Sequence, residues 1–232
     1  MAGIKQIRRT RKPRKSVIKP TPQEQDVWLN DVIDTHLQGI MTPHKGGVFH
    51  PSVLSNACDR ALWLAYHGRM VETPLPANLQ RIFQAGNYLE KRVEQWFYGL
   101  NILIAREVPV HFESPPISGR IDFLIRHQEF GIIPIELKSI NTTGFGKLTK
   151  PKPEHQIQLQ LYLNMGNYAQ GTVLYENKND QKIKSFIVKR DEKQWNELLE
   201  RCFRIQEMIE MPQICTGEMW CNCKHVPFED AS

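Results

Sequence analysis

An α/β fold, with helices layered against a β-sheet, is predicted by three features of the sequence. Apolar residues recur at helical spacing through much of residues 23–100, and short β-rich runs follow through residues 102–140. Helical and β-rich segments then alternate as far as residue 211. Because alternating helices and strands bury their apolar faces against one another, we expect helices to flank the sheet.

Three helices are expected in the first hundred residues, which form the predicted N-terminal helical part at 22–100. The first spans Gln23–Ile40 and the third spans Leu79–Leu100. The second spans Pro51–His67, because Ser52 can cap its start. Apolar residues recur at helical spacing along this second helix, at Leu54, Cys58, Leu62 and Tyr66.

The strands of the sheet are expected in residues 101–190. Three β-rich runs come first, and a loop, a helix and two further strands follow. The runs are Ile102–Phe112, Ile117–Arg126 and Ile132–Ile140, with a turn at His127–Gly131; the later segments are the loop Lys147–Pro153, the helix Glu154–Tyr168 and the strands Gly171–Glu176 and Lys182–Arg190. A last helix, Asp191–Met211, opens the predicted C-terminal part at 191–232, which also holds a cysteine cluster.

The length and composition fit one globular domain preceded by a basic tail. The chain has 232 residues, of which 41% are hydrophobic and 24% are charged. That is ordinary for a protein with one well-buried core. We expect residues 1–21 to form a flexible tail and residues 22–232 to form the single domain.

The net charge of +5 has its source in the tail. Residues 1–19 contain eight basic residues and no acidic residue: Lys5, Arg8, Arg9, Arg11, Lys12, Arg14, Lys15 and Lys19. Removing these eight charges leaves about −3 for the rest of the chain. The tail can neutralise phosphates or remain a solvated arm, so charge alone does not identify a ligand. No run approaches the roughly 18 apolar residues of a membrane span, and the tail lacks the apolar stretch of a secretory signal.

The strands on either side of the turn at His127–Gly131 place three ionisable groups together. If Arg126 pairs with Ile132 across the turn, the same register sets Asp122 opposite Glu136. Glu136 and Lys138 are two positions apart and share one face of the strand. We therefore expect Asp122, Glu136 and Lys138 to form one site.

Two opposed carboxylates on neighbouring strands repel each other unless a cation lies between them. Magnesium and manganese prefer such oxygen ligands. A bound divalent ion can activate water and stabilise charge at a phosphate, with Lys138 placed to assist. This pattern indicates phosphodiester hydrolysis, whereas the alternative is a solvent-exposed Glu136–Lys138 pair on an edge strand.

The motifs Gly119-x-x-Asp122, Glu136-x-Lys138 and Gln158-x-x-x-Tyr162 resemble, in order and spacing, the RecB-like branch of the PD-(D/E)xK nucleases. The resemblance covers about residues 48–225 and includes the CRISPR-associated RecB-like exonucleases and their phage relatives. It implies a restriction-endonuclease-like core with a mixed sheet. The catalytic residues that it implies are Asp122, Glu136, Lys138, Gln158 and Tyr162.

The same resemblance implies metal ligands beyond the two carboxylates. His50, just before the second helix, matches a metal-ligating histidine of that branch, although an isolated histidine is more often a packing residue. The backbone carbonyl of Leu137 is a further implied ligand. Glu90 is an additional candidate from a neighbouring helix, where exposed glutamates are common.

The chain has five cysteines, three of which crowd together near the C-terminus. An odd number in this arrangement favours metal or cluster ligation over a disulfide framework. The nuclease branch implies a [4Fe-4S] cluster, with one cysteine before the core and three after it: Cys58, Cys215, Cys221 and Cys223. Their spacing departs from the usual terminal Cys-x-x-Cys pair. The alternatives are zinc at Cys215, Cys221, Cys223 and His225, or unligated thiols. Cys202 is expected in the core.

The function expected from these residues is a Mg- or Mn-dependent DNA exonuclease that acts at free ends in recombination, repair, phage DNA metabolism or CRISPR adaptation. The basic loop residues Lys147, Lys150 and Lys152 could guide a DNA strand, whereas the alternative is a solvated loop with no such role. A structure-specific endonuclease and a catalytically silent iron-sulfur DNA-binding subunit are the alternatives. We expect a cytoplasmic protein of a prokaryotic or phage-infected cell, with DNA as its partner and no membrane association.

Overall fold

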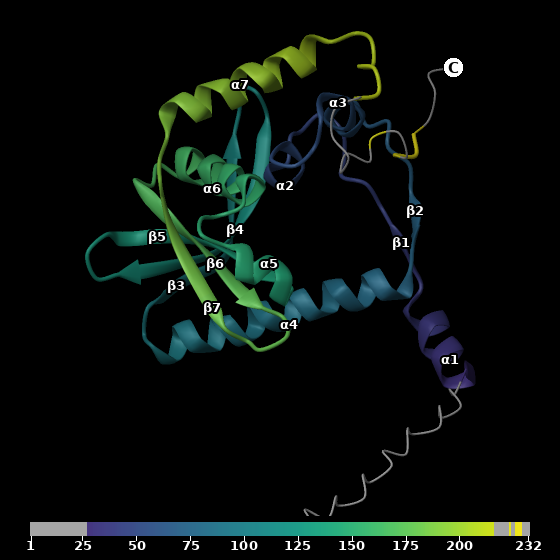
Figure 1. Ribbon diagram of the computed structural model, residues 1–232. Coiled ribbons are helices and arrows are strands. Elements are labelled where there is room, and N and C mark those ends of the chain that lie inside the picture. Colours follow the sequence, from purple (N-terminus) through teal and green to yellow (C-terminus); the bar gives the residue numbers. More distant parts are fainter. Residues whose placement is uncertain (1–26, 216–222, 224–225, 229–232) are drawn as a thin grey trace, which may run out of the picture.

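A five-stranded mixed sheet lies at the centre of the computed structural model, which describes residues 27–215, 223 and 226–228 (Figure 1). Its strand order is β3-β4-β5-β6-β7. The strands are β3 (Leu103–Phe112), β4 (Ile117–His127), β5 (Gly131–Ile140), β6 (Gln170–Asn177) and β7 (Ile183–Lys189). Strands β5 and β6 are parallel, whereas the other neighbouring pairs are antiparallel. The predicted α/β class with a mixed sheet is confirmed.

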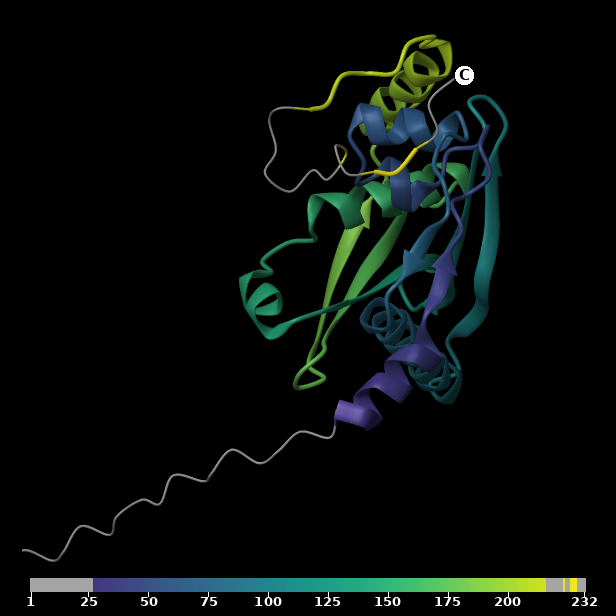
Figure 2. The ribbon, with the colours of Figure 1, turned by 90° about the vertical axis from the view of Figure 1, so that its right-hand side faces the viewer.

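Helices cover both faces of this sheet (Figures 1 and 2). The helices are α1 (Val27–Leu37), α2 (Pro51–Leu54), α3 (Asp59–Tyr66), α4 (Ala77–Gly99), α5 (Thr142–Lys147), α6 (Pro153–Met165) and α7 (Glu192–Glu207). Helix α4 packs Val93 and Phe97 against Ile135 and neighbouring apolar residues of the sheet. Helix α6 packs Leu159 against Val173 and Tyr175 on the opposite face. The strands of the sheet therefore pack against apolar helix side chains on both faces.

Helix α4 is long and buries only part of its apolar surface. It runs for 23 residues and buries Ala77, Leu89, Val93 and Phe97. The last three pack against the sheet, whereas charged residues and several large apolar residues, Phe83 among them, are exposed. None of the helices that the structure describes is long and apolar enough to cross a membrane.

A helical lobe, formed by α2, α3 and α7, packs beside the sheet (Figure 1). Leu62 and Leu64 of α3 join Leu198 and Ile205 of α7 in one buried cluster. Arg201 connects the same helices, since its guanidinium donates to Asp59 Oδ1 at 2.8 Å, Leu54 O at 3.1 Å and Ala57 O at 2.7 Å. These bonds satisfy carbonyls at the end of α2 that a short helix leaves without internal partners.

The register of the β4–β5 hairpin is the predicted one. Arg126 pairs with Ile132, and the ladder continues to the pair Phe123–Ile135. The turn is shorter than expected, because His127 and Gly131 pair with each other and residues 128–130 connect the strands. Gly131 has φ of 71°, a left-handed conformation that glycine adopts at little cost.

Three local predictions are wrong. The helix predicted for Pro51–His67 is two helices, since the chain is extended at Cys58 (φ −71°, ψ 169°) before α3 begins. The start of α2 is preceded by His50 as its N-cap residue, so Ser52 does not cap it. The helix expected to reach Ile40 ends at Leu37, because β1 (Gly39–Met41) pairs with β2 (Thr73–Leu75). The expected tail at 1–21 lies outside the described residues.

Candidate active site

Asp122 lies where β4 and β5 separate. The β4–β5 ladder ends at the pair Phe123–Ile135, one step before Asp122 and Glu136. Beyond that pair, Asp122 Oδ2 accepts a hydrogen bond from the backbone N–H of Leu137 at 2.7 Å. A side-chain carboxylate thus takes the place of a backbone acceptor and holds the two strands in register.

This hydrogen bond also fixes the direction of the Leu137 carbonyl. The N–H and C=O of one residue in a strand point to the same edge of that strand. The N–H of Leu137 points to Asp122, so its carbonyl points to that edge as well. The geometry therefore supports the predicted use of the Leu137 carbonyl as an oxygen ligand.

Glu136 is buried beside Lys138. Its side chain is 1% exposed, and its Oε1 lies 2.5 Å from Lys138 Nζ. Its other oxygen, Oε2, is buried and has no hydrogen-bond partner among the described residues. A solvent-exposed ion pair on an edge strand is thereby excluded, because β5 lies between β4 and β6.

The electrostatics of the site penalise its two negative charges. Burial and the nearby charge of Glu136 raise the pKa of Asp122 well above its ordinary value. Burial also raises the pKa of Glu136, although the ammonium of Lys138 opposes that shift. Burial lowers the pKa of Lys138, but the attraction of Glu136, Asp122 and Glu90 outweighs burial and raises it overall. The site would therefore be stabilised by a further positive charge.

The oxygen donors of this site fit a divalent cation. Glu136 Oε2 is a buried oxygen with no hydrogen-bond partner among the described residues, and the charge of Glu136 acts on Asp122. Glu90 of α4 adds a third negative charge that acts on both carboxyl groups. Carboxylate and carbonyl oxygens are the ligands that Mg²⁺ and Mn²⁺ prefer. Metal binding by these residues stays a prediction.

Helix α6 supplies the predicted Gln-x-x-x-Tyr pair to the same place. Lys138 Nζ donates to Gln158 Oε1 at 3.1 Å, and Gln158 Nε2 donates to the Tyr162 hydroxyl at 3.2 Å. Burial and the charge of Glu136 raise the pKa of Tyr162, so its phenol stays protonated at neutral pH. The helix thus orients Lys138 through a chain of neutral polar groups.

At Gly119 of β4, side chains of α2 and α6 lie close to the strand. A Cβ at Gly119 would lie 2.7 Å from Pro51 Cγ and 2.9 Å from Tyr162 Cε1. Contacts this short require the neighbouring groups to shift. The sequence motif Gly119-x-x-Asp122 therefore has a steric reason.

We expect Gly119→Ala to displace Tyr162 and to lower the free energy of unfolding by about 1–3 kcal/mol. The nuclease activity expected from the sequence should fall, because Gln158 contacts both Tyr162 and Lys138. Urea unfolding and cleavage rates measure the two effects, with Gly146→Ala as the control because a Cβ at Gly146 meets nothing within 4 Å. Equal stability and activity in Gly119→Ala and Gly146→Ala would contradict this explanation.

His50 is oriented by β4 but lies apart from the carboxylates. Its Nδ1 lies 3.1 Å from the backbone oxygen of Ser118, which suits an N–H donor at Nδ1 and leaves Nε2 as the lone-pair nitrogen. Burial and the neighbouring His44 lower its pKa, which favours the neutral form that binds metals. His50, Asp122 and Glu136 do not form a group with all ligand atoms within 4.8 Å, by a search of the described residues. Ligation by His50 stays a prediction.

The loop between α5 and α6 carries the three lysines predicted to guide DNA. Lys147 and Lys150 are exposed, and Lys152 is half-buried at the start of α6. Lys184 Nζ donates to Phe145 O at 2.9 Å and to Leu148 O at 3.1 Å, which anchors the loop to β7. Their role in DNA binding stays a prediction.

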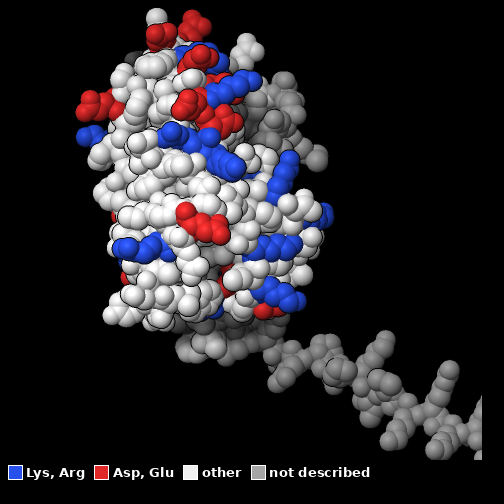
Figure 3. Space-filling model, turned by 90° about the vertical axis from the view of Figure 1, so that its left-hand side faces the viewer, with Lys and Arg blue, Asp and Glu red and all other residues white. Residues whose placement is uncertain are grey.

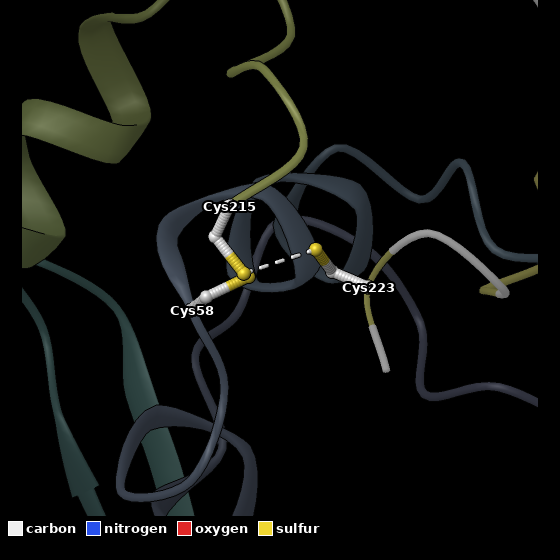
Figure 4. Close-up of side chains that lie close together, drawn as sticks. All are labelled: Cys58, Cys215 and Cys223. Atoms are coloured by element: carbon white, nitrogen blue, oxygen red, sulfur yellow. Dashed lines mark hydrogen bonds between the residues drawn. The ribbon is translucent and has the colours of Figure 1, made fainter. Parts of the chain in front are cut away.

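Three cysteines from distant parts of the sequence converge near the helical lobe (Figure 4). Cys58 precedes α3, Cys215 follows α7, and Cys223 lies further towards the C-terminus. Their sulfur atoms lie within 4.8 Å of one another, and the sulfurs of Cys215 and Cys223 are 3.4 Å apart. Within the described residues this is the only such group of metal-ligand side chains.

This cluster includes Cys58, which belongs to the predicted four-cysteine set and not to the zinc alternative. Cys221 and His225 lie outside the described residues. The identity of a bound metal stays a prediction, because four thiolates can hold either an iron-sulfur cluster or zinc. Cys202 lies in the core of the helical lobe, as predicted, and burial raises its pKa to about 12.

Two polar residues beside the site were not singled out in the sequence. Tyr175 of β6 pairs with Lys138 in the parallel register, and His155 of α6 contacts the Tyr175 hydroxyl. Sequence spacing cannot give the register of strands joined by a long crossover. The spacing of His155, Gln158 and Tyr162 was nevertheless a usable signal, because these positions share one helix face.

Charges are mixed on the side of the molecule that lies at the left of Figure 1. Lys and Arg side chains alternate there with Asp and Glu, and they form no continuous basic patch on the described part of this face (Figure 3). A DNA backbone needs a row of positive charges for strong binding. This face is therefore a poor candidate for the main DNA-binding surface.

Solved structures share this fold. SSO0001 aligns with a TM-score of 0.50 and 20% identity, over 77% of this chain and 84% of that chain. The alkaline exonuclease LHK-Exo from Laribacter hongkongensis aligns with a TM-score of 0.51 and 18% identity, over 69% of this chain and 86% of that chain. Its complex with dAMP aligns with a TM-score of 0.50 and 18% identity, over the same shares. No protein-family model matches the chain, and neither does any curated protein sequence. The likeness shows that the chain shares the fold of these structures, among which is an alkaline exonuclease.

Proposed function

We propose that the protein is a divalent-metal-dependent DNA exonuclease whose centre is Asp122, Glu136 and Lys138. The observation that carries this proposal is the buried Glu136 Oε2, which has no hydrogen-bond partner among the described residues although its carboxylate pairs with Lys138 and its charge acts on Asp122. A protein core does not retain two buried carboxylates and an unsatisfied oxygen without compensation. A bound cation at this position supplies that compensation.

Each residue of the site has a proposed role in hydrolysis. Asp122, Glu136 and the Leu137 carbonyl would hold Mg²⁺ or Mn²⁺, with His50 and Glu90 as further candidates. When bound, the ion supplies Lewis-acid activation of water and stabilisation of charge at the phosphate. Lys138 Nζ is held between Glu136 Oε1 and Gln158 Oε1, so its ammonium is fixed before substrate arrives. That preorganisation favours the developing negative charge of the transition state.

DNA ends are the proposed substrate because the fold is shared with an alkaline exonuclease and with the complex of that enzyme with dAMP. The cysteine cluster is proposed to hold a [4Fe-4S] cluster that fastens the C-terminal segment to α3. In this role it would act on stability rather than on hydrolysis. Lys147, Lys150 and Lys152 are proposed to contact the DNA backbone.

The test is cleavage of end-labelled linear DNA and closed circular DNA of the same sequence, with Mg²⁺ or Mn²⁺ and with a chelator. We expect metal-dependent release of nucleotides from linear DNA and no change in the circle. Cleavage of the circle would establish an endonuclease instead. DNA binding without cleavage, with either metal and on single- and double-stranded ends, would establish a silent binding subunit.

A further inference from the structure

Helix α6 presents a row of three polar side chains to the sheet. His155, Gln158 and Tyr162 occupy positions i, i+3 and i+7, which lie on one face of a helix. Gln158 contacts Lys138, and Gln158 and Tyr162 contact each other. His155 extends this row towards β6, where it contacts Tyr175. It has no part in the site as described so far.

Tyr175 places His155 next to the active-site lysine. The side chain of Tyr175 is fully buried, and the residue pairs with Lys138 across the parallel strands β5 and β6. Its hydroxyl accepts a hydrogen bond from the Lys152 backbone N–H at 3.0 Å and lies 2.8 Å from His155 Nδ1. The imidazole is therefore held where the charge of Lys138 acts on it.

The hydrogen bonds of Tyr175 favour one tautomer of His155, because the buried phenol hydrogen needs an acceptor. The hydroxyl oxygen already accepts from Lys152, and its single hydrogen has His155 Nδ1 as its acceptor among the described residues. Nδ1 is then the lone-pair nitrogen, so Nε2 carries the hydrogen of the neutral ring. No partner of Nε2 is found within the described part of the chain, and the His155 side chain is partly exposed.

The imidazole is neutral under ordinary conditions. Burial and the positive charge of Lys138 lower the pKa of His155 to about 4, against the opposing charge of Glu154. A neutral N–H donor beside a fixed ammonium suits an anionic oxygen that both groups can approach. Phosphodiester oxygens have this chemistry.

We propose that His155 is a substrate-binding residue whose Nε2–H donates to a non-bridging oxygen of the phosphodiester adjacent to the one that Lys138 contacts. This inference rests on the proposed nuclease function and adds a second phosphate contact to it. Tyr175 acts through His155 and is a positioning residue, since its hydroxyl sets the ring orientation.

Three substitutions separate these roles. His155→Phe keeps a ring and removes the donor, and we expect kcat/KM to fall by about 10- to 100-fold, as for the loss of a hydrogen bond to a charged group. His155→Gln restores a side-chain N–H donor and should recover part of that loss. Tyr175→Phe should give a smaller loss, with the His155 ring still present. His127→Phe, at the end of β4, is the matched control and should keep full activity.

A single methylphosphonate, which replaces one charged phosphate oxygen by a methyl group, tests the contact itself. In wild-type protein, this change at the adjacent phosphate should reduce the cleavage rate by about the same 10- to 100-fold factor. The His155→Phe variant should cleave the modified DNA at the same rate as it cleaves unmodified DNA, because this variant has already lost the contact. Mn²⁺ binding, measured by calorimetry, should be the same in both proteins.

Four results would overturn the proposal in different ways. Metal-dependent cleavage that is equal in wild type and His155→Phe, or a methylphosphonate effect that is equal in both at every position, would exclude the contact and leave the nuclease function intact. Absence of metal-dependent cleavage in the wild type would overturn the nuclease function and this contact with it. Loss of Mn²⁺ binding in His155→Phe would show a structural role and also exclude the proposal.

Discussion

Asp122→Asn is expected to abolish cleavage and at the same time to stabilise the metal-free protein at neutral pH. Asparagine keeps an oxygen that can accept from the Leu137 N–H, so the hydrogen bond at 2.7 Å can be retained. It removes the negative charge that repels Glu136. The loss of a metal-binding carboxylate should reduce the cleavage rate by at least about 10³-fold.

The sign of the stability change follows from the raised pKa of Asp122. A carboxyl group whose pKa is raised by folding favours the folded state below its ordinary pKa of 3.8, and that contribution is lost as pH rises through the raised value. The charge of Asp122 therefore destabilises folded wild-type protein in chelator at pH 7–8. The asparagine side chain of the variant carries no charge and avoids this penalty. We expect the free energy of unfolding of metal-free Asp122→Asn to exceed that of metal-free wild type at this pH, since the substitution removes the buried charge.

Urea unfolding in chelator at pH 7.5 and near pH 4 measures this effect, with the stability gain shrinking at the lower pH. Asp180→Asn is the matched control of opposite sign. Hydrogen bonds from Lys182 hold the pKa of Asp180 below its usual value, so neutralising it should not stabilise the protein. A metal-free Asp122→Asn protein that is less stable than wild type at pH 7.5 would contradict the repulsion described here.

Cys58→Ala is expected to remove the metal of the cysteine cluster and to destabilise the helical lobe. Cys58 and Cys223 are far apart in the sequence, and a group bound by both fastens the C-terminal segment to the start of α3 (Figure 4). A ligand present at a thousand times its dissociation constant stabilises the folded state by about 4 kcal/mol. For a chain of this size, that loss lowers Tm by about 8–16 °C.

Metal content, visible absorbance and thermal unfolding of anaerobically purified protein measure these changes. Cys202→Ala is the control, because Cys202 is buried in the lobe and is not part of the cysteine cluster. It should retain the metal while losing some packing. Iron and sulfide in wild type would identify an iron-sulfur cluster, whereas zinc would identify the alternative metal. Equal metal content in wild type and Cys58→Ala would exclude Cys58 as a ligand.

The hairpin of the candidate site could be predicted from the sequence because its geometry is local. A short turn fixes the register of two antiparallel strands, and side chains alternate between the faces of a strand. Those two rules place Asp122 near Glu136 and set Glu136 beside Lys138. The structure adds the separation of the strands just beyond Phe123, which no periodicity records.

Long-range arrangements could not be predicted in the same way. Leu54, Leu62 and Tyr66 have the sequence spacing of one continuous helix, although the backbone is extended at Cys58 between two helices. This spacing fits one helix and two helices equally well. The pairing of β1 with β2 joins segments about thirty residues apart and depends on tertiary packing. The position of His50 depends likewise on its contact with Ser118.

The most direct test of the account measures Mn²⁺ binding and cleavage of end-labelled linear DNA on the same preparations of wild type, Asp122→Asn and Lys138→Met. We predict that wild type binds the ion and releases nucleotides from the DNA end, that Asp122→Asn loses both properties, and that Lys138→Met binds Mn²⁺ but does not cleave. Undiminished cleavage by Asp122→Asn or Lys138→Met would show that the catalytic centre lies elsewhere.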